Sequence, residues 1–211
     1  MEVNRNDALL VVDVQNDFCP GGTLAVAGGD EIVPSILRLS RSFDHILLTQ
    51  DWHPPHHASF ASSHPGHQPF EVIETFYGQQ RLWPDHCVQG TRGAEFHPRL
   101  TLPKAELVLR KGFRRAIDSY SAFVENDRIT PTGLTGYLRE RGLTRLVLAG
   151  LATDYCVRYS ALDARRNGFE AIVVEDACRP IAGGQDYAGV MDDLRQAGVV
   201  VVRETDISVP G

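Results

Sequence analysis

Six short runs of apolar residues, rich in valine, isoleucine and leucine, recur along the chain. Each run is continuously apolar rather than alternating, and each is too short to form a helix. This pattern is typical of strands that are buried on both faces of a parallel sheet. The runs occupy residues 8–14, 45–50, 106–110, 144–150, 170–174 and 199–202.

Amphipathic stretches that predict helices lie between these runs, at residues 30–42, 132–141, 154–167 and 185–197. Alternation of strands and helices indicates a three-layer α/β/α domain whose mostly parallel, doubly wound sheet has six strands. We expect one such domain over 1–211. Glycines follow three of the helices and suit left-handed C-terminal caps. These glycines are Gly142, Gly168 and Gly198.

One segment, at about 51–105, interrupts the alternation. It holds seven of the eight histidines and most of the prolines, with little periodicity. A loop of this length within a compact domain is usually functional or disordered. Its aromatic residues argue against disorder, because disordered segments are poor in them. We therefore expect a functional loop insertion with polar side chains that could bind a metal.

Composition and charge narrow the classes of function. The net charge is -6 and no run of Lys or Arg is present, so a nucleic-acid partner is not expected. No window is apolar enough to span a membrane, and the N-terminus lacks the pattern of a secretory signal, which predicts a cytoplasmic protein. The four cysteines should then stay reduced. They form no CxxC cluster, so a structural zinc ribbon is not expected either.

Three chemically reactive side chains are placed at the carboxyl ends of predicted strands. Asp13 lies in VVDVQNDF, Lys111 follows ELVLR, and Cys156 lies in GLATDYC. Such ends meet at one edge of a parallel sheet, so we expect the three to lie together. Taken singly, Asp13 could be a paired core carboxylate, Lys111 a solvated lysine and Cys156 a buried packing residue.

The predicted helix start beside Cys156 favours ionisation of its thiol. If Thr153 is the N-cap, Cys156 is the third helical residue and feels the positive end of the helix dipole. A lysine nearby would act in the same direction, and both effects favour the nucleophilic thiolate. A Thr153 cap would, however, occupy the backbone N–H of Cys156.

A second group of polar residues has the character of a metal site. Asp51 and His53 follow a strand in DWHPPHH and project from the same side of an extended backbone, which Pro54 and Pro55 keep from becoming helical. His86, in WPDHC, is a candidate third ligand. One carboxylate with imidazoles suits Zn, Fe or Mn with open positions. The alternative is a polar surface loop, and we assign the remaining histidines of the loop, apart from His57, to that class.

Taken together, several motifs resemble the nicotinamidases of the isochorismatase-like cysteine hydrolase superfamily over essentially the whole chain. They are VVDVQNDFCPGGTLAV, TQDWHPPHHASF, LWPDHCVQGTRGAEFHP, RKGFRRAIDSYSAF, GLATDYCVRYSALDA and VVEDACR. The pair DWHP and WPDHC distinguishes nicotinamidases from members of the superfamily that lack a metal. The segment RRAID at 114–118 departs from the more acidic turn of many relatives.

The resemblance implies hydrolysis of nicotinamide to nicotinate and ammonia through a cysteine thioester. It implies one divalent metal ion, zinc ahead of iron or manganese, that positions the pyridine ring. It also implies a cis peptide before Ala152, with the N–H groups of Ala152 and Cys156 directed at the oxyanion. The residues that would carry these roles are Asp13, Lys111 and Cys156 for catalysis, Phe18, Trp83 and Tyr120 for the ring, and Asp51, His53 and His86 for the metal.

His57 matches a residue that ligates the metal in some relatives and only lines the site in others. The resemblance implies a small-molecule substrate and leaves room for a homo-oligomer. Two rival interpretations remain at this stage. One is another amidohydrolase or an isochorismatase-type hydrolase of the same superfamily, and the other is a non-catalytic metal-binding protein on this fold.

Overall fold

The central sheet forms where the apolar runs predict it. The computed structural model of the protein describes residues 1–181 and 187–208. Six parallel strands lie in the order β5-β2-β1-β6-β7-β8, and β1 is buried along its whole length. The predicted six-stranded parallel sheet is therefore confirmed. The strands are β1 (Asp7–Val12), β2 (His45–Asp51), β5 (Leu107–Lys111), β6 (Arg145–Leu151), β7 (Glu170–Arg179) and β8 (Val200–Val202).

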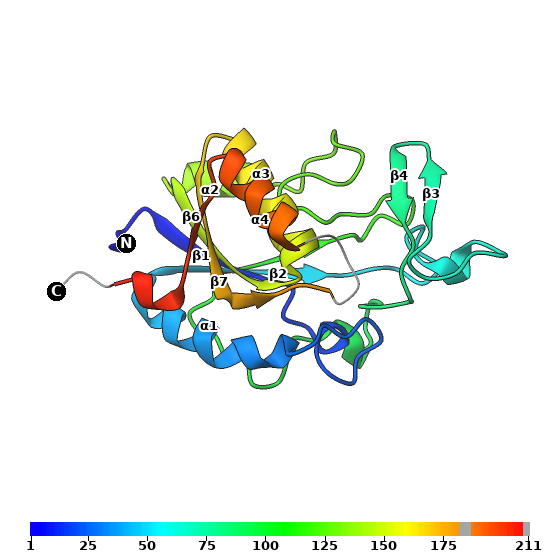
Figure 1. The fold of residues 1–211 in the computed structure, drawn as a ribbon, viewed down its shortest axis with the longest axis horizontal. Coiled ribbons are helices and arrows are strands. Elements are labelled where there is room, and N and C mark those ends of the chain that lie inside the picture. The colour runs from blue at the N-terminus through cyan, green and yellow to red at the C-terminus, as the bar shows by residue number, and fades with distance from the viewer. Residues whose placement is uncertain (182–186, 209–211) are drawn as a thin grey trace.

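Helices cover both faces of the sheet, as the alternation predicts. Helix α1 lies on one face, and α2, α3 and α4 lie on the other (Figure 1). The glycines at 142, 168 and 198 all have positive φ, which confirms the predicted left-handed turns after three of the helices. The helices are α1 (Val33–Leu39), α2 (Leu134–Glu140), α3 (Arg158–Arg166) and α4 (Tyr187–Gln196).

The boundaries of two predicted elements differ from the structure. The helix expected over 30–42 is α-helical only in α1, with 3-10 turns at Gly29–Ile32 and Ser40–Ser42. Strand β7 runs well past its apolar stretch, because after an irregularity it pairs with β6 again at Gly150 and Cys178. The expected start of the last helix, at 185–186, lies outside the described residues.

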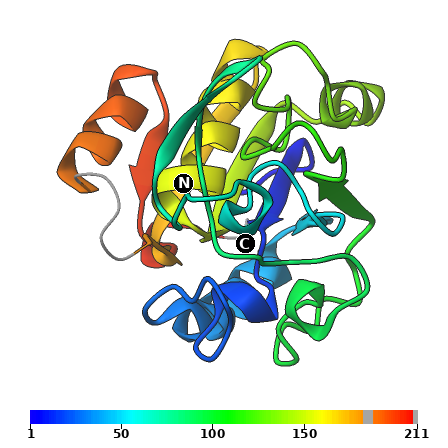
Figure 2. The ribbon, with the colours of Figure 1, turned by 90° about the vertical axis from the view of Figure 1, so that its right-hand side faces the viewer.

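The loop segment after β2 is more ordered than its lack of periodicity suggests. It contains an antiparallel hairpin, β3 (Val72–Thr75) with β4 (Gly78–Arg81), and two 3-10 turns. Figure 2 looks onto the carboxyl edge of the sheet, where this segment crosses in front of the strands. The insertion thus covers the edge at which the reactive side chains were expected. In the described ranges no helix has both the length and the apolar character of a membrane span.

Candidate active site

The ends of four neighbouring strands bring a lysine, two aspartates and a cysteine into contact. Lys111 Nζ lies 2.8 Å from Asp13 Oδ2 and 2.7 Å from Asp51 Oδ1. It also donates to the Ser119 carbonyl at 2.9 Å and to Cys156 Sγ at 3.4 Å. The lysine is buried, so its charge is balanced by the two carboxylates rather than by water. The structure therefore places Asp13, Lys111 and Cys156 together, as the strand ends predict.

Asp13 is held in a turn that directs its carboxylate toward the lysine. It follows β1 with a left-handed φ of 46°. Thr49, on the adjacent strand β2, donates its hydroxyl to Asp13 Oδ1 at 2.7 Å and accepts the Asp13 N–H at 3.1 Å. One carboxylate oxygen is thus fixed by Thr49, and the other faces Lys111. These contacts orient the Asp13 carboxylate, which is fully buried.

Cys156 lies at the start of a helix, but the start differs from the predicted one. The chain begins a π-helical turn at Thr153–Val157 with Ala152 as its N-cap, and no side chain caps it. The expected Thr153 cap is therefore wrong, and the conflict over the Cys156 N–H disappears with it. The Leu151–Ala152 peptide is cis, as the resemblance implies.

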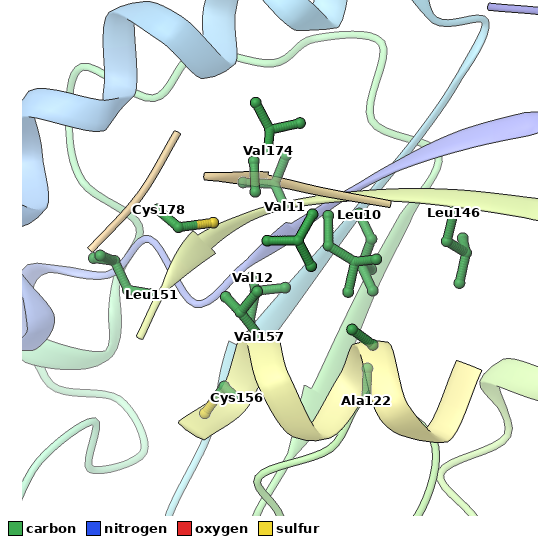
Figure 3. Packing of buried hydrophobic residues seen from close by; sticks show 14 of the residues in the cluster. Leu10, Val11, Val12, Ala122, Leu146, Leu151, Cys156, Val157, Val174 and Cys178 are labelled. Carbon is green, nitrogen blue, oxygen red and sulfur yellow. The ribbon is translucent and has the colours of Figure 1, made fainter. Parts of the chain in front are cut away.

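Packing against the sheet orients this turn. Val157 points from the helix start toward Val12 of β1, whereas the Cys156 side chain points away from those strands (Figure 3). Gly150, just before the turn, has a φ of 133°, and a side chain there would lie 2.1 Å from the Val12 carbonyl oxygen. Only glycine allows β6 to approach β1 this closely before the chain turns to Cys156.

Burial decides which form of the cysteine is present at rest. It raises the pKa of the Cys156 thiol well above its ordinary 9.0, Lys111 acts against this, and Asp13 and Asp51 add to it. The structure thus favours a thiol, contrary to the thiolate expected from the helix start, because loss of water outweighs the lysine. Burial likewise raises the pKa of Asp13, against the effect of Lys111. A buried thiol next to a carboxylate of raised pKa is suited to proton transfer between them.

Asp51, His53 and His86 form a compact group of metal-ligating atoms. All three are buried, and one ligating atom from each lies within 4.8 Å of the others. Each imidazole uses Nδ1 on a backbone carbonyl, His53 on Gly112 at 2.9 Å and His86 on Pro84 at 2.8 Å. Each Nε2 therefore faces Asp51 Oδ2, at 3.1 and 3.5 Å. A carbonyl partner on Nδ1 leaves the Nε2 lone pair free to bind a metal.

The environment of Asp51 favours its ionised form, which can bind a cation. Burial alone would raise its pKa, but Lys111 and then His53 and His86 together hold that pKa well below its usual 3.8. Gln15 fixes the backbone of Asp51 from both sides, accepting its N–H at 2.8 Å and donating to its carbonyl at 2.8 Å. The donor set therefore fits a divalent cation with one carboxylate oxygen and two imidazole nitrogens.

His57 lies beside this group but uses both of its ring nitrogens elsewhere. Its Nε2 faces the carbonyls of Arg114 and Ile117 at 3.0 and 3.2 Å, and its Nδ1 accepts the Ser59 N–H at 3.2 Å. Its ring packs against that of His53 with centroids 4.2 Å apart. Burial, followed by the charge of His53, lowers the pKa of His57 to about 4. One ligating atom of His57 also lies within 4.8 Å of ligating atoms of His53 and Asp118.

Cys156 lines one small cavity together with Asp51 and His86 of the metal-ligating group. Phe18, Trp83 and Tyr120 line it, as predicted for an aromatic substrate. Trp83 donates its indole N–H to the Tyr120 oxygen at 3.1 Å, and Phe18 lies against the His86 ring. Flat, largely apolar walls of this kind suit a planar ring.

Sequence reasoning missed several residues that shape this cavity. Leu24, Tyr155 and Ile181 also line it, as does Asp118. Gln80, buried in β4, donates to Asp118 Oδ2 and to the Tyr120 oxygen, both at 3.0 Å. Tyr155 could have been suspected as the neighbour of Cys156. Gln80 carried no signal, because its hairpin has no apolar pattern.

Comparison with known proteins places this geometry in context. Residues 7–206 match the family of the Isochorismatase domain. A nicotinamidase of Acinetobacter baylyi is 52% identical and the match covers 99% of this chain and 98% of that protein. The solved nicotinamidase and pyrazinamidase of Acinetobacter baumanii has a TM-score of 0.95 at 55% identity, covering 96% and 98%. The Pyrococcus horikoshii pyrazinamidase, solved in complex with zinc, has a TM-score of 0.77 at 35% identity, covering 94% and 99%.

Proposed function

The chain belongs to the isochorismatase family, and from this premise we propose that it hydrolyses nicotinamide to nicotinate and ammonia. The observation that carries the proposal is the meeting of two groups in one cavity. Cys156, which contacts Lys111 in a cluster with Asp13, lines the cavity. So do Asp51 and His86 of the Asp51–His53–His86 cluster, beside flat aromatic side chains. The first cluster suits acyl transfer and the second suits binding of a ring nitrogen.

Acylation begins with the Cys156 thiol and the adjacent Asp13 carboxylate. Asp13 accepts the thiol proton as Sγ attacks the amide carbon, and the carbonyl electrons move to the oxygen. The oxyanion is stabilised by the N–H groups of Ala152 and Cys156, and one such donor is worth about 3 kcal/mol in comparable enzymes. Asp13 then gives its proton to the nitrogen, the C–N bond breaks, and ammonia leaves a thioester on Cys156.

Deacylation reuses the same carboxylate. Asp13 takes a proton from water while the water oxygen attacks the thioester carbon. The C–S bond breaks, and the proton held by Asp13 returns to the sulfur to restore the thiol. Lys111, which lies 2.8 Å from Asp13 and 3.4 Å from Sγ, stabilises the negative charge as it passes between these two groups.

The metal site supports substrate positioning. Asp51, His53 and His86 would hold a divalent ion, and zinc is our choice over iron or manganese. When bound, this ion supplies a Lewis acid that orients the pyridine nitrogen and polarises water. Phe18, Trp83 and Tyr120 hold the ring so that the amide carbon faces Cys156. We place the enzyme in the cytoplasm, where its four free, buried cysteines would stay reduced.

Product analysis tests the proposed activity. Purified protein loaded with Zn²⁺ should release ammonia and nicotinate in equal amounts from nicotinamide. Benzamide has the same shape but lacks the ring nitrogen, so it should react about 100-fold more slowly or worse. Isochorismate should yield no pyruvate. Release of pyruvate without ammonia would instead assign the chain to the ether-hydrolysing branch of its family.

Removal of one imidazole should empty the metal site. We expect His53→Ala to bind Zn²⁺ at least about 100-fold more weakly than the wild type. The substitution removes the ligating Nε2 together with the hydrogen bond from Nδ1 to the Gly112 carbonyl that orients the ring. Metal content after gel filtration measures this. His67→Ala is the matched control, since His67 lies in the same loop segment but is exposed. One equivalent of zinc retained by His53→Ala would refute the ligand assignment.

A further inference from the structure

Asp17 is a buried carboxylate that the proposed mechanism does not use. It lies in the 3-10 turn Asn16–Phe18, directly before a residue of the cavity wall. Among the described residues no lysine, arginine or histidine forms an ion pair with it. A buried, unpaired carboxylate is costly unless backbone N–H groups hold it, so its presence here calls for a specific role.

The partners of Asp17 connect it to the metal-ligating group. Its Oδ2 accepts the N–H of Cys87 at 2.7 Å, and its Oδ1 accepts the N–H of Thr23 at 3.3 Å. Cys87 directly follows His86, and its carbonyl accepts the N–H of His53 at 3.0 Å. Cys87 is thus hydrogen-bonded to Asp17 through its N–H and to His53 through its carbonyl.

The backbone at Cys87 needs this support. Its φ is 46°, a left-handed conformation that is uncommon for a residue other than glycine, asparagine or aspartate. Without a hydrogen-bond partner for the Cys87 N–H, an extended backbone at Cys87 would have a lower free energy than the left-handed one. Such a change would rotate His86 away from Asp51 and weaken the contact to His53. The hydrogen bond from Cys87 to a charged carboxylate opposes it.

Two glycines make room for Asp17, one for its carboxylate and one for its backbone. A side chain at Gly93 would lie 2.0 Å from Asp17 Oδ2, and one at Gly22 would lie 2.4 Å from the Asp17 backbone. The backbone carbonyl of Asp17 also accepts the N–H of Leu24, another residue of the cavity wall. The surrounding chain is therefore fitted to a carboxylate at this position.

We propose that Asp17 is a positioning residue for the metal site: by holding the Cys87 peptide in its left-handed turn, it keeps His86 and His53 directed at Asp51 and so sets the affinity for the divalent ion. The inference rests on the metal site of the proposed function. It adds to the three ligands a carboxylate that touches neither metal nor substrate. Removal of a residue that orients a metal ligand typically weakens metal binding by about 10- to 100-fold.

Competition between a chelator and the protein for Zn²⁺ tests the proposal without any measurement of activity. Asp17→Ala should raise the dissociation constant for Zn²⁺ about 10- to 100-fold. Asp17→Asn keeps one oxygen for the Cys87 N–H but loses the charge, so its affinity should fall less, by about 3- to 10-fold. If the alanine variant does not fold, a loss in the asparagine variant of at least about 3-fold still supports the proposal, and unchanged affinity overturns it.

Asp7→Ala is the matched control for a merely structural effect. Asp7 is also buried and begins β1, whereas Asp17 follows the opposite end of that strand. Asp7 pairs with Arg145. This variant should lower the thermal unfolding midpoint and leave zinc affinity within about 2-fold of the wild type. Wild-type affinity in Asp17→Ala, or an equal loss in both variants, would overturn the role of Asp17. Failure of the wild type to bind Zn²⁺ would instead refute the metal site itself, and this inference with it.

Discussion

Replacing Cys156 with alanine should lower kcat for nicotinamide by about 10⁴-fold or more, because among the described residues Cys156 is the cysteine that lines the cavity. Loss of a nucleophile in enzymes with a comparable acyl intermediate has effects of that size or larger. The variant should still bind substrate, since the aromatic wall and the metal-ligating group remain intact. Steady-state ammonia release and equilibrium binding of nicotinamide, measured on the same preparation, separate the two properties.

The control for this variant is Cys178→Ala. Cys178 is a free, buried cysteine on β7 and does not line the catalytic cavity. Its replacement should cost some stability through lost packing but leave kcat within about 3-fold. If Cys156→Ala kept a kcat within 10-fold of the wild type, attack by sulfur would be excluded and water would have to attack the amide directly.

Replacing Lys111 with methionine should remove activity and destabilise the metal-free protein by about 3–5 kcal/mol. Methionine keeps much of the volume, but it leaves Asp13 and Asp51 as buried carboxylates without their shared cation. Chemical unfolding in the presence of a chelator measures the loss. Lys104→Met, at the chain's only other lysine, which is exposed, should change stability by less than about 0.5 kcal/mol.

The destabilisation of Lys111→Met should depend on pH in a defined direction. Lys111 lowers the pKa of both Asp13 and Asp51, so its removal raises both pKa values in the folded state. A carboxyl whose folded pKa is raised costs its full share of stability above that pKa, and the cost disappears as pH falls to the pKa of the unfolded chain. The wild type also loses the stabilisation from Asp51 as pH falls below its usual 3.8. The difference between the two proteins should therefore be largest at neutral pH and should shrink on acidification.

A difference in stability that stays constant from pH 7 to about pH 4 would contradict this account. It would mean that methionine disturbs packing rather than the charge balance of the two carboxylates. The measurement therefore tests whether Lys111 stabilises the site through its charge.

Most residues of the site could be predicted from the sequence, because they are polar residues at the ends of apolar runs. Asp13, Asp51 and Cys156 each end or follow a buried strand, Lys111 ends the half-buried edge strand β5, and parallel strand ends meet at one edge. A continuous run of apolar residues locates the end of such a strand to within about two residues. It does not locate a strand that continues through polar residues, which is why β7 was predicted to end five residues too early.

The supporting contacts could not be read in this way. Asp17, Gln80 and Asp118 act through hydrogen bonds to residues far away in the chain, and nothing in their local pattern shows the partner. The protonation of Cys156 also escaped prediction. Its helix-start position favours a thiolate, but the degree of burial, which a sequence does not show, outweighs that effect.

The central claim is that Cys156 carries the acyl group between amide and acid, and partitioning with hydroxylamine tests it most directly. Hydroxylamine added to the nicotinamide reaction competes with water for a thioester. The account predicts that nicotinohydroxamate replaces nicotinate in proportion to the hydroxylamine concentration, while ammonia release does not slow. Formation of nicotinate alone at every hydroxylamine concentration would show that water attacks the amide directly and would contradict the account.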